Sequence, residues 1–199
     1  MKTIKKQNKL GKILVISGPS GSGKTTLLSS LIQDRQIKRY LVKSCSVTTR
    51  PKRSQEKEGQ EYFFVTALEF KRQLKSKKIL EWTRYLGYYY GTPKAPLERL
   101  LERKKSVGLC LDLKGARILK KLYPDNTITV FILPPSLGVL KKRIQNRCCK
   151  TNPQEIKQRI LLADKELQAA GEFDFCVLNQ NLETAVKKLK KIFLQESSV

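Results

Sequence analysis

The stretch Ile13-Leu14-Val15-Ile16-Ser17-Gly18-Pro19-Ser20-Gly21-Ser22-Gly23-Lys24-Thr25-Thr26 decides the fold of this chain. An apolar run leads into a glycine-rich loop that matches the phosphate-binding pattern G-x-x-x-x-G-K-[ST] without a mismatch. Behind the loop, apolar residues recur at helical spacing at Leu27, Leu28, Leu31 and Ile32. The sequence therefore predicts a buried strand over 12–17, a phosphate-binding loop, and a helix over 24–34.

Each residue type in this loop has a physical reason to be there. Glycines let the backbone turn with positive φ, so that successive N–H groups and the start of the next helix point at an anion. Lys24 is expected to reach the β- and γ-phosphates, and the Thr25 hydroxyl to ligate Mg²⁺. The predicted ATP-binding residues are Gly18, Pro19, Ser20, Gly21, Ser22, Gly23, Lys24, Thr25 and Thr26. The alternative, a flexible Gly/Ser turn that happens to contain lysine, fits the flanking strand and helix less well.

The rest of the chain alternates helical and extended patterns, which is typical of an α/β fold with a central parallel sheet flanked by helices. Apolar runs at 107–111, 128–133 and 175–178 predict buried strands. Residues 44–65 are expected to be irregular up to a strand-like end at 62–65. Helical patterns cover 67–76, 93–104, 137–147, 153–167 and 182–194.

The composition is strongly basic, with 41 Lys and Arg against 17 Asp and Glu, a net charge of +24 over 199 residues. Three explanations compete: polyanionic small substrates, a nucleic-acid partner, or a lysine-rich, solvated surface. The basic residues are spread along the whole chain, and neither an RNP-like aromatic motif nor zinc-finger spacing is present. We therefore expect no specific nucleic-acid binding, although nonspecific adhesion at low salt is expected.

Cysteine and histidine usage limits the chemistry. The five cysteines form no C-x-x-C pair and the chain has no histidine, so a structural zinc site is not expected. Free thiols fit a reducing compartment. No apolar run approaches the ~20 residues that a membrane span needs, and no signal-peptide core follows the basic start. The sequence predicts a cytoplasmic protein without a membrane partner, either a monomer or a homodimer.

The block 43–92 has a composition of its own, rich in Thr, Arg, Tyr and Gly with little periodicity, and is expected to be an inserted substrate lobe. It places Arg50 and Arg53 three residues apart and adds Tyr62 and the run Tyr88-Tyr89-Tyr90. Arginine forks and phenol hydroxyls suit a phosphate monoester. The pattern fits equally a solvated basic loop beside a tyrosine-rich strand.

The order of six motifs resembles the guanylate kinase family, P-loop nucleoside monophosphate kinases that phosphorylate GMP and dGMP from ATP. The motifs are the phosphate loop, S-x-T-T-R-x-x-R at 46–53, E-x-x-G-x-x-Y at 56–62, E-W at 81–82, Y-G-T at 90–92 and D-x-x-G at 112–115. The likeness covers nearly the whole chain. It implies one domain over 1–199, with a core at about 10–42, 93–137 and 168–199, a GMP-binding lobe at about 43–92 and a lid at about 138–167.

The resemblance also assigns roles to individual residues. It implies that the GMP phosphate is held by Arg50, Arg53, Tyr62 and Tyr90, and that guanine is surrounded by Ser46, Glu81, Thr92 and Asp112. Lys24 and Thr25 would act on ATP and Mg²⁺, Arg147 and Arg159 would be catalytic lid arginines, and Asn179 would lie near the adenosine.

Chemistry supports the guanine assignment independently. The N1–H and N2–H₂ donors of guanine call for carboxylate acceptors such as Glu81 and Asp112, whereas adenine would leave those carboxylates unpaired. Without the resemblance, Glu81 reads as a surface acid before a buried Trp82, and Asp112 as a helix cap at a strand end. Phosphoryl transfer relies on charge neutralisation and alignment, so the missing histidine is no objection.

Several positions depart from the family pattern. Cys110 replaces the first acid of an Asp-x-Asp segment, and a thiol is a poor Mg²⁺ ligand. Lys114 stands where glutamine is usual, and the run Arg147-Cys148-Cys149-Lys150 is about one residue longer, which shifts the register to Arg159. The leading interpretation is an active guanylate kinase in purine nucleotide metabolism. The alternatives are a catalytically weakened nucleotide- or peptide-binding module, favoured by Cys110, and a basic nucleic-acid-binding protein.

Overall fold

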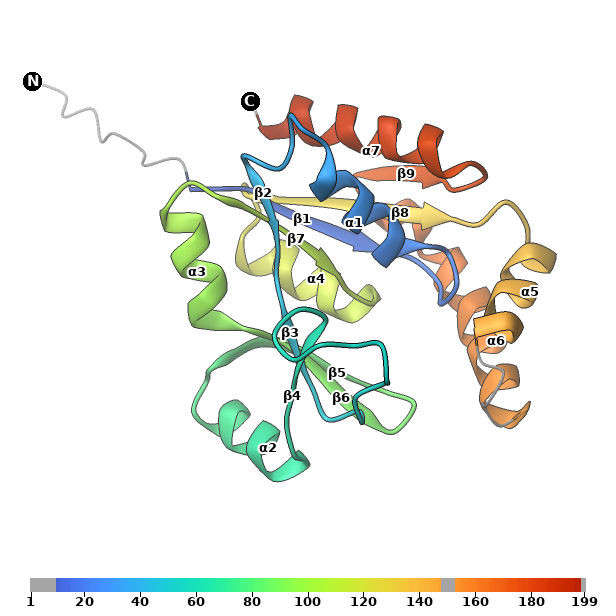
Figure 1. Ribbon diagram of the computed structural model, residues 1–199, viewed down its shortest axis with the longest axis horizontal. Coiled ribbons are helices and arrows are strands. Elements are labelled where there is room, and N and C mark those ends of the chain that lie inside the picture. Colours follow the sequence, from blue (N-terminus) through green and yellow to red (C-terminus); the bar gives the residue numbers. More distant parts are fainter. Residues whose placement is uncertain (1–9, 148–152, 198–199) are drawn as a thin grey trace, which may run out of the picture.

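The computed structural model describes residues 10–147 and 153–197, and its centre is a five-stranded parallel sheet (Figure 1). The strand order is β2-β7-β1-β8-β9. The strands are β1 (Ile13–Ser17), β2 (Leu41–Lys43), β7 (Ser106–Cys110), β8 (Thr127–Leu133) and β9 (Phe175–Leu178). Every neighbouring pair is parallel, so the carboxyl ends of the strands share one edge. In such a sheet that edge is where ligands bind.

Helices cover both faces of this sheet. They are α1 (Lys24–Gln33), α3 (Lys94–Glu102), α4 (Leu113–Leu122) and α7 (Leu182–Ser197). The two faces follow from the alternation along β1, where Leu14 and Ile16 point one way and Ile13 and Val15 the other.

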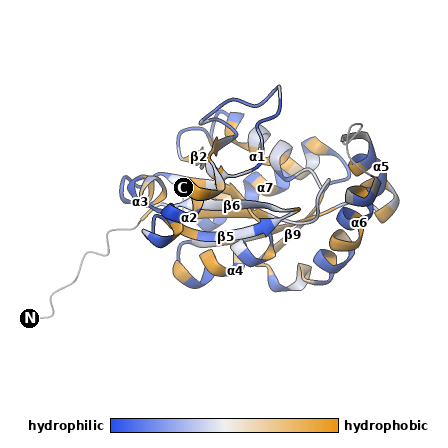
Figure 2. Cartoon of the chain, turned by 90° about the horizontal axis from the view of Figure 1, so that it is seen from below, coloured by the Kyte–Doolittle hydropathy of each residue, from blue (hydrophilic) through white to orange (hydrophobic). Residues whose placement is uncertain are grey.

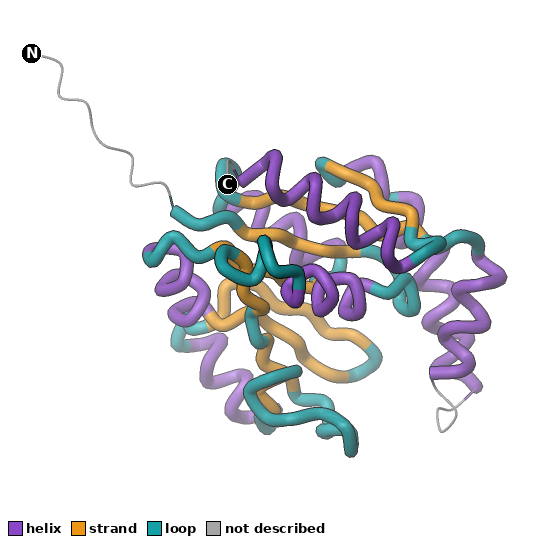
Figure 3. The backbone as a smooth tube through the Cα atoms, turned by 45° about the horizontal axis from the view of Figure 1, so that its top comes forward, coloured by secondary structure: helices purple, strands orange, loops and turns teal. Residues whose placement is uncertain are grey.

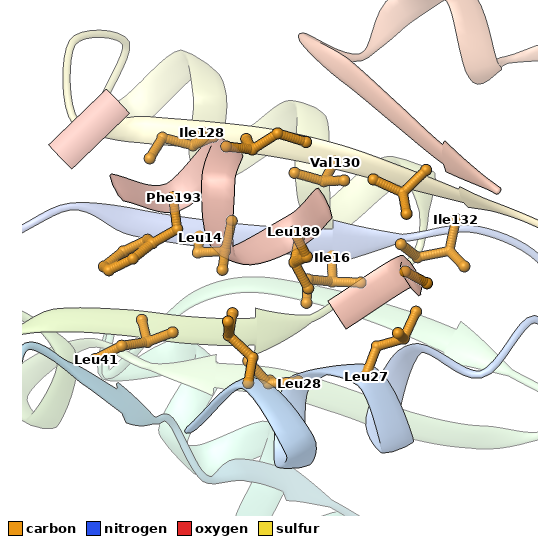
Figure 4. Close-up of a cluster of buried hydrophobic side chains, with 14 of the residues drawn as sticks. Leu14, Ile16, Leu27, Leu28, Leu41, Ile128, Val130, Ile132, Leu189 and Phe193 are labelled. Atoms are coloured by element: carbon orange, nitrogen blue, oxygen red, sulfur yellow. The ribbon is translucent and has the colours of Figure 1, made fainter. Parts of the chain in front are cut away.

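The larger core lies between the sheet and the helices α1 and α7 (Figure 4). Leu27 and Leu28 from α1 meet Leu189 and Phe193 from α7 across the strand residue Ile16, and all of these side chains are at most 1% exposed. The opposite face packs on α3 and α4 through Leu97, Leu101, Ala116 and Leu119. The phosphate loop therefore emerges from the most buried strand and enters a helix anchored in this core.

A second sheet has four strands in the order β4-β3-β6-β5 (Figure 1). The chain enters it from the first sheet where β2 is followed by β3. Its elements are β3 (Ser46–Thr48), β4 (Tyr62–Phe64), α2 (Ala67–Lys75), β5 (Ile79–Tyr85) and β6 (Tyr88–Pro93). β5 and β6 form an antiparallel hairpin, and β6 also pairs with β3. Its small core of Val47, Phe70 and Ile79 is separate from the larger cores, so this sheet is a packed unit of its own.

Two further helices, α5 (Leu137–Arg147) and α6 (Pro153–Gln168), pack against each other beyond the carboxyl ends of the strands (Figures 1 and 3). Leu140, Ile144 and Ala163 form their shared core, and a short 3₁₀ turn, η1 (Ala170–Glu172), leads from α6 into β9. The helices carry alternating hydrophobic and hydrophilic bands, as helices with one packed face should (Figure 2). Within the described residues, no helix is long and apolar enough to cross a membrane.

The α/β class with a parallel sheet flanked by helices is confirmed. The predicted strands and helices all form, with ends shifted by at most three residues. The expectation that 44–65 is irregular up to its last strand is wrong in one place, because β3 runs over Ser46–Thr48. Short β2, the hairpin β5–β6 and helix α4 also lay outside the sequence prediction.

Candidate active site

The phosphate loop is an open ring of backbone between β1 and α1. Gly18, Gly21 and Gly23 adopt φ values of 133°, 86° and 95°, which L side chains rarely take. A Cβ at Gly18 would lie 2.6 Å from the Ile132 carbonyl oxygen, so this position also requires glycine for space. Helix α1 begins without a side-chain cap and without an acid in its first turn. Its first N–H groups and positive dipole end are therefore left to bind an anion.

Two side chains fix the shape of the loop. Lys24 folds back and donates from Nζ to the carbonyl oxygens of Gly18 (2.6 Å) and Pro19 (3.0 Å), which places its charge over the ring. Asn179, directly after β9, is 6% exposed and donates from Nδ2 to the Ser22 carbonyl oxygen at 2.7 Å. Its amide packs so closely on Gly23 that a Cβ there would collide with it. Asn179 therefore lies against the phosphate loop itself, and its predicted proximity to adenosine stays a prediction.

One pocket of about 170 Å³ joins this loop to the second sheet. It is lined on one side by Gly18, Ser20 and Lys24, and on the other by Ser46, Tyr62, Glu81, Tyr90 and Asp112. Residues predicted to bind two different ligands thus face a single space. The arrangement can hold a polyphosphate at one end and a second molecule at the other.

Glu81 is the buried acid of this pocket. It lies on β5, is 3% exposed, and accepts a 2.5 Å hydrogen bond from the hydroxyl of Thr92 on the neighbouring strand. Trp82 is 36% exposed. The alternative interpretation, an exposed Glu81 before a buried Trp82, is therefore wrong, because the acid is buried and the tryptophan is exposed. Burial, together with the charge of Asp112, raises the pKa of Glu81 to about 7.

Asp112 fits both interpretations of its position, a helix cap and an acid that faces the pocket. It is the N-cap of α4, accepting from the Gly115 N–H at 2.8 Å, and it also lines the pocket beside Glu81. Gly115 lets the acids come together, because a Cβ there would lie 2.7 Å from Glu81 Oε2. Lys114 rests with its ammonium 4.8 Å from the centre of the Trp82 ring, where its charge opposes the rise in the pKa of Glu81.

The Arg/Tyr cluster forms the next part of the lobe. Arg50, with 12% of its side chain exposed, donates from Nη2 to Glu56 Oε1 at 2.6 Å and lies 5.6 Å from the Tyr62 ring centre. The rings of Tyr62 and Tyr90 meet edge to face at 5.9 Å. Burial raises the pKa of Tyr62 to about 12, so its hydroxyl remains a hydrogen-bond donor throughout the physiological range.

Arg53 stands apart from this cluster. Its side chain is exposed, and its backbone N–H donates to Glu56 Oε2 at 2.9 Å. Its positive charge opposes the rise in the pKa of Tyr90 that burial causes. The interpretation of the whole stretch as a solvated basic loop therefore fits Arg53 better than Arg50.

The surroundings of Thr25 fit a magnesium ion that arrives with a triphosphate. Thr25 is exposed at the start of α1, and interaction with its hydroxyl opposes the rise in the pKa of Cys110 at the end of β7. Burial raises the pKa of Cys110 to about 11, which keeps the thiol protonated and a poor cation ligand. No group of three His, Cys, Asp or Glu side chains that could hold a metal exists among the described residues. Among the described residues Thr25 stays the expected oxygen ligand, and phosphates and water would supply the others.

The predicted lid arginines lie on the paired helices. Arg159 is on α6, and its positive charge opposes the rise in the pKa of Tyr85 at the end of β5. Arg147 is the last residue of α5, but its side chain lies outside the described residues, as do Cys148, Cys149 and Lys150. The predicted one-residue shift of register to Arg159 is therefore untested.

Three residues that sequence reasoning missed also line the pocket: Thr83, Tyr85 and Glu166. The first two could have been found, because residues two and four after Glu81 face the same side of a strand. Burial raises the pKa of Tyr85, and interaction with Ser20 of the phosphate loop opposes that rise. Glu166 lies seven residues after Arg159 on one helix face, a spacing that the sequence shows but does not single out.

Comparison with known proteins identifies the arrangement. The family model described as guanylate kinase matches residues 10–196. The chain belongs to the guanylate kinase family. The guanylate kinase of Synechocystis sp. is 41% identical over 186 residues, covering 94% of this chain and 95% of that protein. The guanylate kinase of Malacoplasma penetrans is 38% identical over 194 residues, with 97% of each covered.

The fold is also that of a solved guanylate kinase. The crystal structure of guanylate kinase from Anaplasma phagocytophilum superposes with a TM-score of 0.79 at 29% identity, covering 96% of this chain and 88% of that one. The resemblance carried by the six motifs is thereby confirmed. The match includes the phosphate loop, the second sheet and the paired helices, because residues 10–196 contain all of them.

Proposed function

We propose that the pocket described above is the active site in which this guanylate kinase transfers the γ-phosphoryl group of ATP to GMP. Family membership makes the chain an ATP:GMP phosphotransferase, a nucleoside monophosphate kinase. The proposal adds which residues bind each nucleotide. ATP binds on 18–26, with Lys24 in contact with its phosphates, and GMP binds between Glu81 and the Arg50 cluster. The single observation that carries it is the shared pocket, lined from both sides.

The donor end works through main-chain groups and fixed charge. The N–H groups of the loop and the start of α1 hold the phosphates, and Lys24 neutralises charge as it develops on the transferred group. Mg²⁺, bound by phosphate oxygens and the Thr25 hydroxyl, would neutralise further charge and align the phosphates. Arg147 and Arg159 would reach the transferred group from the lid, and their helices would exclude water.

The acceptor end selects guanine by pairing buried groups. Glu81 and Asp112 accept hydrogen bonds from N1–H and N2–H₂ of guanine, while Ser46 and Thr92 complete the set of side chains around the base. A substrate that lacks those donors leaves the acids unpaired, and a buried unpaired polar group is penalised heavily. Arg50, Arg53, Tyr62 and Tyr90 hold the GMP phosphate and present its oxygen in line with ATP.

The same proposal assigns the parts of the chain: core about 10–42, 93–137 and 168–199, GMP lobe about 43–92, and lid about 138–167. The separate sheets and separate apolar clusters support this division. Cytoplasmic location, a monomeric or homodimeric state, and the absence of a specific nucleic-acid partner stay predictions.

ADP production from Mg-ATP, measured in parallel with GMP, dGMP, AMP, CMP and UMP, tests the proposal. We expect turnover with GMP to exceed turnover with AMP by on the order of 10⁴-fold, because only guanine satisfies both acids. Equal rates with AMP would contradict the assignment of the acids. Tight ATP binding without any turnover would favour the alternative of a nucleotide- or peptide-binding module.

A further inference from the structure

The strand β5, which carries the buried acid Glu81, is irregular directly before Trp82. In its pairing with β6, Ile79 lies opposite Pro93, and Trp82 lies opposite Gly91. β5 thus advances three residues while β6 advances two, which leaves one extra residue in β5. This is a β-bulge, and β5 is the edge strand of the second sheet, where bulges are common and re-aim a side chain. Glu81 lies within the bulged stretch.

The bulge decides which way Glu81 points. Ile79 belongs to the small core of the second sheet. Trp82 lies on the same side, because its ring centre is 5.7 Å from that of Tyr89, which packs on that core. Residues three apart on a regular strand point to opposite faces, so the extra residue explains why Ile79 and Trp82 share one. In a regular strand Glu81, two residues after Ile79, would point into this apolar core instead of the pocket.

The start of helix α4 contacts the end of the bulge at two consecutive residues. A Cβ at Gly115 would lie 2.7 Å from Glu81 Oε2, and the Lys114 ammonium lies 4.8 Å from the centre of the Trp82 ring. The second distance is that of a cation–π interaction. α4 packs on the first sheet and β5 belongs to the second. These two contacts therefore join the parts of the molecule that supply the two acids of the pocket, Asp112 and Glu81.

Lys114 is the member of this joint that can be changed without opening a core. Its side chain is exposed, whereas Gly115 is buried and required for space. Trp82 is 36% exposed, and the Lys114 ammonium lies over its ring. Glutamine, the residue that the family pattern has at position 114, is uncharged and makes no cation–π contact. The lysine of this chain thus adds a contact at the end of the bulge.

We propose that Lys114 is a positioning residue for guanine, which holds Trp82 at the end of the bulge and thereby keeps Glu81 turned toward Asp112. The inference rests on the proposed function in taking these two acids as the acceptors for guanine. It predicts that loss of the Lys114–Trp82 contact weakens the use of GMP and leaves the ATP end of the pocket as it is.

A double-mutant cycle with Lys114→Met and Trp82→Leu tests the proposal by steady-state kinetics. Methionine keeps an unbranched side chain and removes the charge. Lys114→Met is expected to raise the KM for GMP about 2- to 5-fold, the range of an exposed cation–π contact, with kcat and the KM for ATP changed by less than about twofold. In the Trp82→Leu background the same change should have no further effect. Lys114→Arg, whose guanidinium also stacks on aromatic rings, should use GMP like the parent.

Trp82 is the single tryptophan of the chain, so its fluorescence reports the contact without any nucleotide. We expect its emission maximum to shift in Lys114→Met and to stay that of the parent in Lys121→Met. Lys121 is the matched control, because it is an exposed lysine in the last turn of the same helix and its loss changes the net charge equally. The KM for GMP should also be unchanged in Lys121→Met.

An equal rise in the KM for GMP in Lys121→Met would show a general charge effect and overturn the proposal. Unchanged emission or an unchanged KM for GMP in Lys114→Met would also overturn it, as would an effect that persists in full in the Trp82→Leu background. Where Trp82→Leu does not fold, Trp82→Phe replaces it, and the effect of Lys114→Met should then be smaller than in the parent, because phenylalanine attracts a cation less than tryptophan does. A parent protein that does not phosphorylate GMP would contradict the proposed function, while the fluorescence comparison would still show whether Lys114 acts on Trp82.

Discussion

The two ends of the pocket are built in different ways. The donor end is made of backbone from one unbroken stretch, in which glycines supply the shape and Lys24 lies across the ring. The acceptor end is made of side chains from β3, β4, β5, β6 and the start of α4. A backbone site requires an anion and a space, whereas a side-chain site requires particular donors and acceptors. The donor end should thus determine whether transfer occurs, and the acceptor end which nucleotide receives the phosphoryl group.

Both ends hold an internal carboxylate, but the two come from different parts of the chain. Glu56 binds Arg50 from within the same loop, six residues away. Glu166 lines the pocket with Ser20 and comes from α6, more than a hundred residues along the chain. The Glu56–Arg50 pair can keep the guanidinium in place for a phosphate, whereas Glu166 adds a negative charge to the pocket that Lys24 also lines.

The largest effect should come from the donor end. Lys24→Ala removes the cation over the loop, and kcat is expected to fall by on the order of 10³-fold with every acceptor nucleotide. The preference for GMP over AMP should stay the same, because the acceptor end is intact. Steady-state kinetics with both nucleotides measures this, with Lys187→Ala on the exposed face of α7 as the control. A change in the nucleotide preference would show that the two ends are not separable.

Removing the buried acid Glu81 should change the preference for GMP over AMP and leave ATP binding nearly unchanged. Glu81→Ala is expected to lower kcat/KM for GMP by about 10²- to 10³-fold, because the guanine donors lose their acceptor inside a buried site. ATP affinity should be nearly unchanged, since Glu81 touches Thr92 and Gly115 rather than the loop. Calorimetry with ATP and kinetics with GMP and AMP together give the result. An unchanged GMP-to-AMP ratio would remove Glu81 from the guanine site.

The pH dependence of GMP binding should follow the same residue. The pKa of Glu81 is raised to about 7 by burial and by Asp112, so the carboxyl gains a proton as pH falls through 7. A protonated carboxyl accepts less well, and the KM for GMP is expected to rise about tenfold per pH unit below that value. GMP itself titrates near pH 6, so the matched control is Glu81→Gln, which should retain only the substrate's dependence.

Stability should change with pH in the opposite sense. Because the folded pKa of Glu81 lies above its ordinary value of 4.5, the folded state binds the proton more tightly. Its contribution to the free energy of unfolding therefore grows as pH falls from about 7 towards 4.5 and is lost as pH rises. Weaker GMP binding together with a higher melting temperature at pH 6 would separate titration from unfolding. A fall in both would indicate that the acid form damages the fold.

The contrast between the two ends also explains what the sequence could predict. The donor end is local, so the pattern from Gly18 to Thr25 and its flanking residues predicted the buried strand, the loop and the helix that the structure shows. The core strands β1, β7 and β8 were predicted because buried parallel strands are continuous apolar runs. Short β2 and β3 carry too few residues to show any period, and their pairing depends on neighbours distant in sequence.

The acceptor end required more than local pattern. The burial of Glu81 under Thr92 and Gly115 is set by the hairpin β5–β6 and the start of α4, which periodicity did not predict. The six motifs identified most of its residues through resemblance to a family, while Tyr85 and Glu166 had no motif of their own. Glu166 in particular comes to line the pocket only through the packing of α5 and α6, which no single stretch of sequence predicts.

The smallest effect is expected where the two ends meet, at Cys110. The Cys110 thiol lies near Thr25, the metal ligand proposed for this chain, and near Lys24, and both oppose the rise in its pKa. Cys110→Asp places a carboxylate there, and hard oxygen ligands suit Mg²⁺ better than sulfur does. The Mg²⁺ concentration for half-maximal rate, and for half-maximal ADP binding by calorimetry, should fall about 3- to 10-fold. Cys110→Asn matches aspartate in shape without its charge and should leave the Mg²⁺ dependence near that of the parent. If aspartate and asparagine give the same values, position 110 does not act on the metal, and the donor end relies on Thr25 and phosphate alone.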